Sequence, residues 1–74
     1  MSPIEVKRIR KKLAITQEEM AVLLGFTNKQ TVKNVEVGTT KLGKLPAKLL
    51  RYIDGLPEKR IPDFIKEFNR YETE

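Results

Sequence analysis

Apolar side chains recur at intervals of three and four residues along most of the chain. This spacing is typical of helices that bury one face and leave the other in water. It predicts an all-α chain of five helices that forms a single domain over residues 1–74. The apolar positions of the five segments are, in chain order, Val6, Ile9 and Leu13; Met20, Ala21, Leu23 and Leu24; Val32 and Val35; Leu49, Leu50 and Ile53; and Ile61, Phe64, Ile65, Phe68 and Tyr71.

Capping signals predict where the first two helices begin. Ser2 is followed three residues later by Glu5, and Thr16 is followed by Glu19. In such a pair the hydroxyl accepts a hydrogen bond from the backbone of the acid, and the carboxylate accepts one in return, which makes a capping box. Gly25 can adopt the left-handed conformation that ends a helix, so the second helix is expected to end there.

A turn separates the second helix from a short third helix. Either Thr27 or Asn28 can cap this third helix, which is expected to run from about residue 28 to residue 35 or 36. Two short helices joined through a glycine turn have the shape of a helix-turn-helix motif. We therefore expect a helix-turn-helix core over about residues 17–36.

Prolines and a glycine delimit the last two helices. Pro46 suits the start of a fourth helix, which Gly55 is expected to end. Pro62 suits the start of a C-terminal helix over about residues 61–72. The loop before the fourth helix carries two leucines that we expect to cover the core, Leu42 and Leu45.

Basic residues are concentrated in the first two thirds of the chain. The net charge is +5 and the pI is near 9.7. Residues 1–51 contain 11 Lys and Arg against 4 Asp and Glu, a balance of +7, whereas residues 52–74 contain 4 against 6, a balance of −2. A basic surface that belongs to the first four helices favours a polyanionic partner, although Lys-rich surfaces also serve solubility alone.

The residue types that are absent exclude several classes of function. The chain contains no Cys and no His, so disulfides, thiolate metal sites and the commonest general base are excluded. We therefore expect no enzyme activity, no metal, no cofactor and no small-molecule ligand. No apolar run approaches the roughly 18 residues of a membrane span, and charges interrupt the N-terminus every few residues, so a cytoplasmic location is expected.

The outer face of the third helix carries side chains that can bond to base edges. Gln and Asn can pair with adenine through two hydrogen bonds, and Lys can bond to guanine or to a phosphate. Such residues could serve solubility alone, but no acid occurs between residues 26 and 35, which argues against that interpretation. The candidate base contacts are Asn28, Lys29, Gln30, Lys33 and Asn34.

Candidate phosphate contacts flank this helix. Gln17 lies in the first turn of the second helix, where free backbone N–H groups and the helix dipole favour an anion. An ordinary surface position explains Gln17 equally well. Lys41 and Lys44 lie in a loop with two glycines, where phosphate binding is plausible. The candidate set is Gln17, Thr27, Thr31, Lys41 and Lys44.

Several of these residues carry a family resemblance. The runs are Thr16-Gln17-Glu18-Glu19-Met20-Ala21, then Leu23-Leu24-Gly25-Phe26, then Val32 to Glu36 with Gly38. They resemble the Cro/C1-type (XRE) helix-turn-helix repressor family over roughly residues 4–56. The resemblance implies a compact five-helix lambda-repressor-like domain. It also implies that Gln17 contacts phosphate and buttresses the recognition helix, that Glu36 supports the fold, and that the third helix contacts bases.

The chain departs from the family pattern in one place. From Gly25 to Glu36 it is one residue longer than the common pattern, and the extra residue falls within residues 26–31. The addition lengthens the turn or shifts the register of the recognition helix, so which of the residues at its start meets a base remains open. Val35 also replaces the bulky aromatic residue that usually precedes the family's Glu.

Together these features predict a sequence-specific regulator that binds double-stranded DNA. It would be a repressor or autorepressor of phage or mobile-element type that binds an inverted repeat as a homodimer. The alternative is an antitoxin or other protein-interaction module whose aromatic C-terminal helix binds a partner protein. That helix can pack on the core or on a second copy, and we expect both roles. The candidate dimer contacts are Ile61, Phe64, Ile65, Phe68 and Tyr71.

Overall fold

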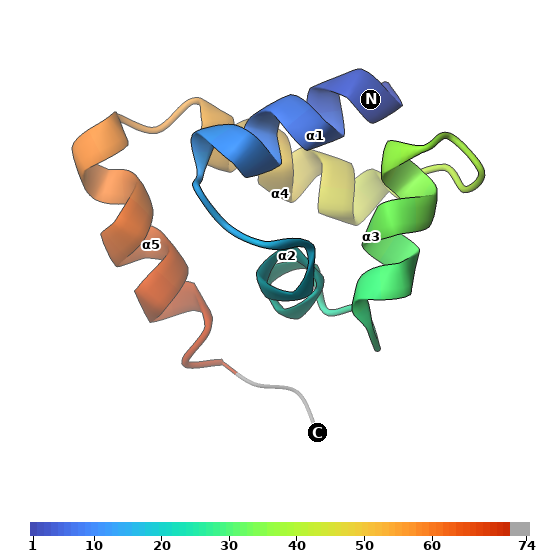
Figure 1. Ribbon diagram of the computed structural model, residues 1–74. Coiled ribbons are helices and arrows are strands. Elements are labelled where there is room, and N and C mark those ends of the chain that lie inside the picture. Colours follow the sequence, from blue (N-terminus) through green and yellow to red (C-terminus); the bar gives the residue numbers. More distant parts are fainter. Residues whose placement is uncertain (72–74) are drawn as a thin grey trace.

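The computed structural model describes residues 1–71, and these contain helices and no strand. The helices are α1 (Pro3–Lys12), α2 (Gln17–Leu24), α3 (Lys29–Glu36), α4 (Lys44–Asp54) and α5 (Ile61–Phe68), with one 3-10 turn, η1 (Glu58–Arg60), before the last (Figure 1). The prediction of an all-α chain of five helices is confirmed. Within the described part of the chain no helix is long and apolar enough to cross a membrane.

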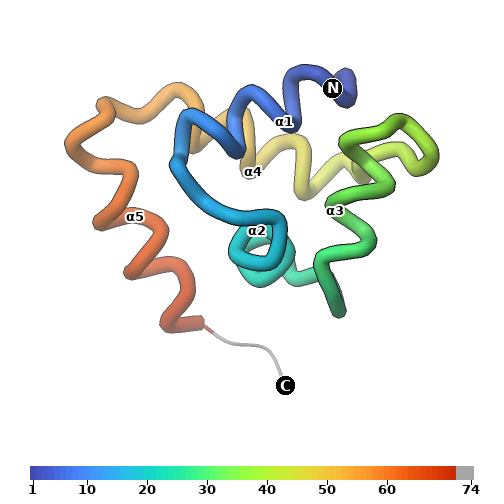
Figure 2. The backbone as a smooth tube through the Cα atoms, viewed as in Figure 1, coloured from blue at the N-terminus to red at the C-terminus, as the bar shows by residue number. Residues whose placement is uncertain are grey.

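Helix α2 is viewed end-on near the centre of Figure 1, below α1 and α4. The backbone trace in Figure 2 shows α3 and α5 on opposite sides of it. Helix α1 packs against both α3 and α4, and α2 packs against α3. Helix α3 is therefore held from two directions, which leaves one of its faces open to solvent.

The core takes residues from every helix. The side chains of Ile9, Met20, Leu23, Leu50 and Ile53 are almost completely buried and form its centre. Each lies at a position that the three- and four-residue spacing assigned to an apolar face. The other buried members of the cluster are Val6, Ala21, Val32, Val35 and Ile61.

The predicted caps of α1 and α2 are confirmed. The Ser2 hydroxyl accepts from the Glu5 backbone N–H at 3.2 Å, and the Glu5 carboxylate accepts from the Ser2 backbone at 3.3 Å. Thr16 and Glu19 exchange the same pair of hydrogen bonds at 3.0 and 2.9 Å. Of the two candidate caps of α3 the structure has Asn28, whose side-chain oxygen accepts from the backbone of the second helical residue.

The first three helices end through a residue in the left-handed conformation. Gly25, with φ of 76°, and Gly38, with φ of 87°, end α2 and α3 at no steric cost. After α2 the backbone N–H of Phe26 donates to the carbonyl of Ala21 at 2.8 Å, which satisfies a carbonyl of the last turn. After α1 the same position is held by Ala14, with φ of 58°, where the Cβ atom makes this conformation costly.

The predicted start of α4 was wrong. Helix α4 begins at Lys44, two residues before Pro46, because the first-turn N–H groups of a helix have no partner inside it and a proline there breaks no bond. Leu45 is consequently on the first turn and 76% exposed, so it does not cover the core, whereas Leu42 packs against it as predicted.

Helix α5 is shorter than predicted. It ends at Phe68, because the backbone N–H of Tyr71 donates to the carbonyl of Phe68, three residues back, in a tight turn. Position 72, the last of the predicted helix, lies outside the described residues.

Candidate nucleic-acid interface

One face of α3 presents polar and basic side chains to solvent. Lys29, Gln30 and Lys33 are exposed, and Asn34 is half-buried. On the opposite side of the helix Val32 and Val35 are buried in the core. We call the set Lys29, Gln30, Lys33 and Asn34 the α3 face. The structure thus brings together four of the five candidate base contacts on a single exposed surface.

Hydrogen bonds order the polar side chains at the start of α3. Asn28, the fifth candidate, uses its side-chain oxygen to accept from the backbone N–H of Gln30 at 2.9 Å. The Gln30 side chain in turn donates from Nε2 to Oδ1 of Asn34 at 3.0 Å. Asn28 therefore has a structural role as the helix cap, and its free amino group alone is left for a ligand.

A partly buried ion pair holds α3 against α1. Arg10 donates from Nε to Oε2 of Glu36 at 2.6 Å and from Nη2 to Oε1 at 3.2 Å, which is the two-pronged arrangement of the strongest ion pairs. The side chain of Arg10 is 15% exposed and that of Glu36 is 4% exposed. Arg10 also donates from Nη1 to the carbonyl of Ile15 at 3.1 Å, so it fixes the loop between α1 and α2.

This structural role was not predicted from the sequence for Arg10. Its position beside the buried Ile9 brings it to the edge of the core. A signal was available, because Glu36 is the single acid between residues 20 and 53 and would need a cation if it were buried.

Gln17 joins the same network. Its Nε2 donates to Oε1 of Glu36 at 3.3 Å, and the side chain is half-buried. The first turn of α2 is thereby tied to the last residue of α3. Because an amide nitrogen carries two hydrogens, Gln17 keeps one N–H to donate elsewhere. Gln17 can thus support α3 and bind an anion at the same time.

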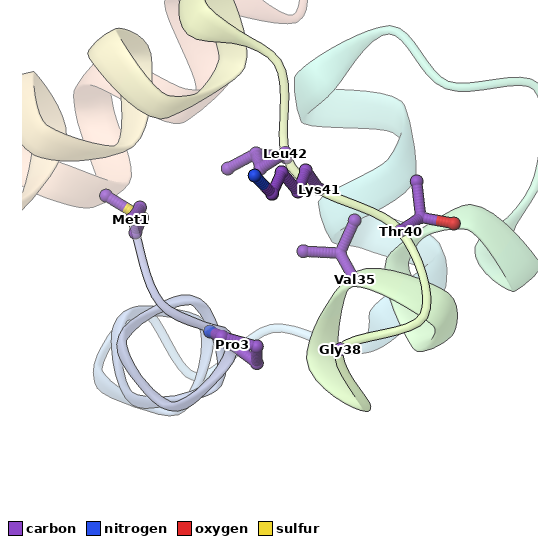
Figure 3. A pocket seen from close by; sticks show the side chains of 7 residues that line it. All are labelled: Met1, Pro3, Val35, Gly38, Thr40, Lys41 and Leu42. Carbon is purple, nitrogen blue, oxygen red and sulfur yellow. The ribbon is translucent and has the colours of Figure 1, made fainter.

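The remaining candidate phosphate contacts are spread around α3. Thr27 is exposed in the turn before it, whereas Thr31 is half-buried on its side. Lys44 is exposed on the first turn of α4. Lys41 lies in the loop after α3 and borders a cavity of about 350 Å³ that also touches Met1, as Figure 3 shows. The other residues that line this cavity are Pro3, Val35, Gly38, Thr40 and Leu42.

A larger apolar groove of about 850 Å³ lies between the end of α2, the start of α4 and a C-terminal segment that contributes Phe68, Asn69 and Tyr71. Phe68 and Tyr71, two of the candidate dimer contacts, line it and are 38% and 76% exposed. Two further lining residues that the sequence interpretation missed are also exposed: Val22 at 63% and Leu45 at 76%. Val22 could have been identified from the sequence, because it is an apolar residue that does not belong to the apolar face of α2.

The rest of the predicted dimer stripe is less accessible. Ile61 is 6% exposed and belongs to the core, so it is not available to a second copy. Phe64 and Ile65 are half-buried and pack against the core from outside. The Phe64 ring lies 5.5 Å from that of Tyr52 and 5.7 Å from that of Phe68, measured between ring centres. The available part of the stripe is its C-terminal end.

A second ion-pair group ties α1 to the end of α4. Asp54 accepts from Nζ of Lys12 at 2.9 Å and from Nη2 of Arg8 at 3.2 Å. Hydrogen bonds from Lys12 and then from Arg8 hold the pKa of Asp54 below its ordinary value. Two of the basic residues of α1 are thus engaged within the protein. Within residues 1–71 no group of three His, Cys, Asp or Glu side chains could hold a metal ion.

No protein-family model, curated protein or solved structure matches this chain. The resemblance to the Cro/C1-type family therefore remains a prediction that rests on the residues quoted above.

Proposed function

We propose that this protein is a sequence-specific, double-stranded-DNA-binding transcriptional regulator with a lambda-repressor-like fold. In this proposal it is a repressor or autorepressor of phage or mobile-element type and a member of the Cro/C1-type family. The observation that carries the proposal is the α3 face, which presents two lysines and two side-chain amides and contains no acid. The partly buried ion pair of Arg10 with Glu36, and the hydrogen bond from Gln17, hold the last residue of α3 against α1 and α2.

The proposed mechanism places α3 in the major groove. A helix fits this groove, where Lys can bond to guanine and Gln or Asn to adenine. Gln30 and Lys33 are exposed, whereas Val32 and Val35 are buried, and we propose that Gln30 and Lys33 contact base edges. Lys29 lies at the edge of the face, within reach of either a base or a phosphate.

Phosphate contacts would fix the register of α3 on the duplex. The first turn of α2 offers backbone N–H groups, the positive end of the helix dipole and the free N–H of Gln17. Lys41 and Lys44 would bind phosphates of the DNA backbone beyond the C-terminal end of α3. The hydroxyl groups of Thr27, before α3, and Thr31, on its side, would donate to other phosphates. Such contacts are independent of sequence and orient the base-contacting helix.

In the proposed complex two copies bind an inverted repeat, with half-sites one helical turn apart. The apolar groove supports a homodimer, because a second copy would cover the exposed side chains of Val22, Leu45, Phe68 and Tyr71. Apolar and aromatic residues are typical of the centres of such interfaces.

The same groove supports the alternative function, a protein-interaction module such as an antitoxin. In that case a different protein would cover the groove, and DNA binding would be secondary or absent. The two functions differ in the mass of the purified protein, because the regulator would be a homodimer and the module a monomer that lacks its partner.

Selection from random duplexes tests the proposal. The purified protein is expected to enrich one inverted repeat, and Lys33→Ala is expected to lose enrichment at one position of each half-site. Lys66→Ala is the matched control, because Lys66 is an exposed lysine on α5, away from the α3 face. Recovery of unrelated sequences by the unaltered protein would contradict the proposal.

A further inference from the structure

The side chains of Gln30 and Asn34 form a bonded pair on the α3 face. Nε2 of Gln30 donates to Oδ1 of Asn34 at 3.0 Å, across one turn of the helix. Gln30 is exposed, and Asn34 is half-buried at the edge of the face. Pairs of this kind, four residues apart, stabilise a helix only slightly, so the bond by itself has a modest structural role.

The hydrogen bond also determines what Gln30 can offer to a ligand. An amide group has two N–H donors and one carbonyl acceptor. One N–H of Gln30 is used on Asn34, so one N–H and the carbonyl oxygen Oε1 remain. Asn28 holds the backbone of the same residue through its cap bond at 2.9 Å. Gln30 is therefore held at its backbone and at its side chain.

The remaining pair of groups matches one base. In the major groove adenine presents an acceptor, N7, beside a donor, the N6 amino group. The free N–H and Oε1 of Gln30 can bond to both. Guanine presents two acceptors, N7 and O6, so Oε1 would face O6 and the two oxygens would repel each other.

Without a partner the amide of Gln30 would not keep this orientation. The terminal torsion of Gln is broad and roughly two-fold, so the N–H and the oxygen can exchange places. In the structure the bond to Asn34 directs Nε2 of Gln30 towards Oδ1 and leaves Oε1 of Gln30 for a ligand. The Nδ2 group of Asn34 remains able to donate to an adjacent base or phosphate.

We propose that Asn34 is a positioning residue that orients the Gln30 amide, and that the pair selects adenine at one position of each half-site. This inference rests on the proposed DNA-binding function. It goes beyond that function because it names the selected base and makes the two residues one unit. Lys33, the neighbouring exposed residue of the α3 face, has hydrogen-bond donors and no acceptor. It would contact a base or a phosphate independently of the Gln30 and Asn34 pair.

The test compares the base preferences of five variants, one of which is Gln30→Ala, on duplexes selected by the unaltered protein. Asn34→Ala removes the partner of Gln30, and Asn34→Asp keeps an oxygen that accepts from Nε2. The double variant Gln30→Ala with Asn34→Ala measures whether the two effects add. The control is Lys66→Ala, because Lys66 is an exposed lysine on α5, away from the α3 face. The quantity is the ratio of Kd for guanine to Kd for adenine at the position where Gln30→Ala acts, and circular dichroism verifies that each variant folds.

We expect Asn34→Ala to reduce this ratio by about tenfold, within the range for one bidentate contact. The double variant is expected to lose no more than either single variant. Asn34→Asp is expected to bind all sequences more weakly, because it adds a negative charge, while it keeps the preference for adenine. Lys66→Ala is expected to leave this ratio unchanged.

The outcomes separate the two proposals. An undiminished adenine preference in Asn34→Ala would overturn the role of Asn34 and leave specific DNA binding intact. Additive effects in the double variant, or an equal loss in Asn34→Asp, would overturn it as well. Failure of the unaltered protein to enrich any sequence would overturn the proposed function and this inference together.

Discussion

Arg10 and Glu36 meet through two hydrogen bonds of 2.6 and 3.2 Å, although they are 26 residues apart in the sequence. Their pair joins the last turn of α1 to the last residue of α3. Because Glu36 is 4% exposed, its charge depends on Arg10 and on Gln17 for compensation.

Removal of one partner is expected to be strongly destabilising. Arg10→Met should lower the free energy of unfolding by about 3 kcal/mol, because it leaves the carboxylate of Glu36 buried without its cation. Urea unfolding followed by circular dichroism measures the effect. Arg8→Met is the matched control on the same helix. The Arg8 side chain is 54% exposed in its ion pair, so a loss below about 1 kcal/mol is expected there. Equal losses in the two variants would contradict the role of Arg10.

The left-handed conformation of Ala14 predicts a stabilising substitution. Ala14→Gly should raise the free energy of unfolding by about 1 kcal/mol, because glycine has no Cβ atom to strain at φ of 58°. Thermal unfolding should show an increase in Tm of about 4–8 °C for a domain of this size. Gly25→Ala, at φ of 76° with no atom near the added Cβ, should produce a loss of similar size. A destabilised Ala14→Gly would show that this end of α1 is not strained.

Asp54 should make stability depend on pH in the acid range. Its pKa is lower in the folded protein than its ordinary value of 3.8, because Lys12 and Arg8 donate to it. The stabilisation is therefore complete above the ordinary pKa and is lost as the pH falls through the folded one. The difference in urea midpoint between the unaltered protein and Asp54→Asn should be constant above about pH 5 and shrink below about pH 4. A difference that persists at about pH 2 would contradict this assignment.

The apolar groove predicts how self-association can be blocked. Leu45→Glu should convert a homodimer into a monomer in sedimentation equilibrium, because it places a charge on an exposed apolar residue of the groove. Ile4→Glu is the control, since Ile4 is 80% exposed on α1 and does not line the groove. A monomeric unaltered protein would contradict the homodimer and favour a different partner.

Lys41 predicts the salt dependence of DNA binding. Lys41→Ala should weaken binding to all sequences alike and reduce the slope of log K against log salt by about 0.9, the value for one phosphate contact. Lys59→Ala, an exposed lysine in η1, should leave the slope unchanged. The measurement is fluorescence anisotropy between about 50 and 200 mM salt. An unchanged slope in Lys41→Ala would place the loop away from the DNA.

Helix ends that depend on residues close together in the sequence were predictable. The capping boxes at Ser2 and Thr16 and the left-handed Gly25 depend on residues three or four apart, so the starts of α1 and α2 and the end of α2 were predicted correctly. Pro46 was misleading, because a proline is compatible with any position of the first turn and does not mark the first residue of a helix.

The contacts that support the candidate site join residues far apart in the sequence, so they were less predictable. The sequence indicated which side chains lie on the α3 face, because Val32 and Val35 are buried opposite them. It did not indicate the ion pair of Arg10 with Glu36, which forms only when α1 packs on α3. The Gln30 and Asn34 bond was within reach, since residues four apart on a helix are neighbours, but its direction depends on the orientation of both amides.

The most direct test of sequence-specific DNA binding is the ratio of two dissociation constants at about 150 mM salt. One is measured for the duplex that the protein enriches and the other for a scrambled duplex of the same composition. If the protein is a sequence-specific regulator, the enriched duplex is expected to bind at least about 10³-fold more tightly, which is the lower end of the range for specific DNA-binding proteins. Equal affinity for the two duplexes would contradict it.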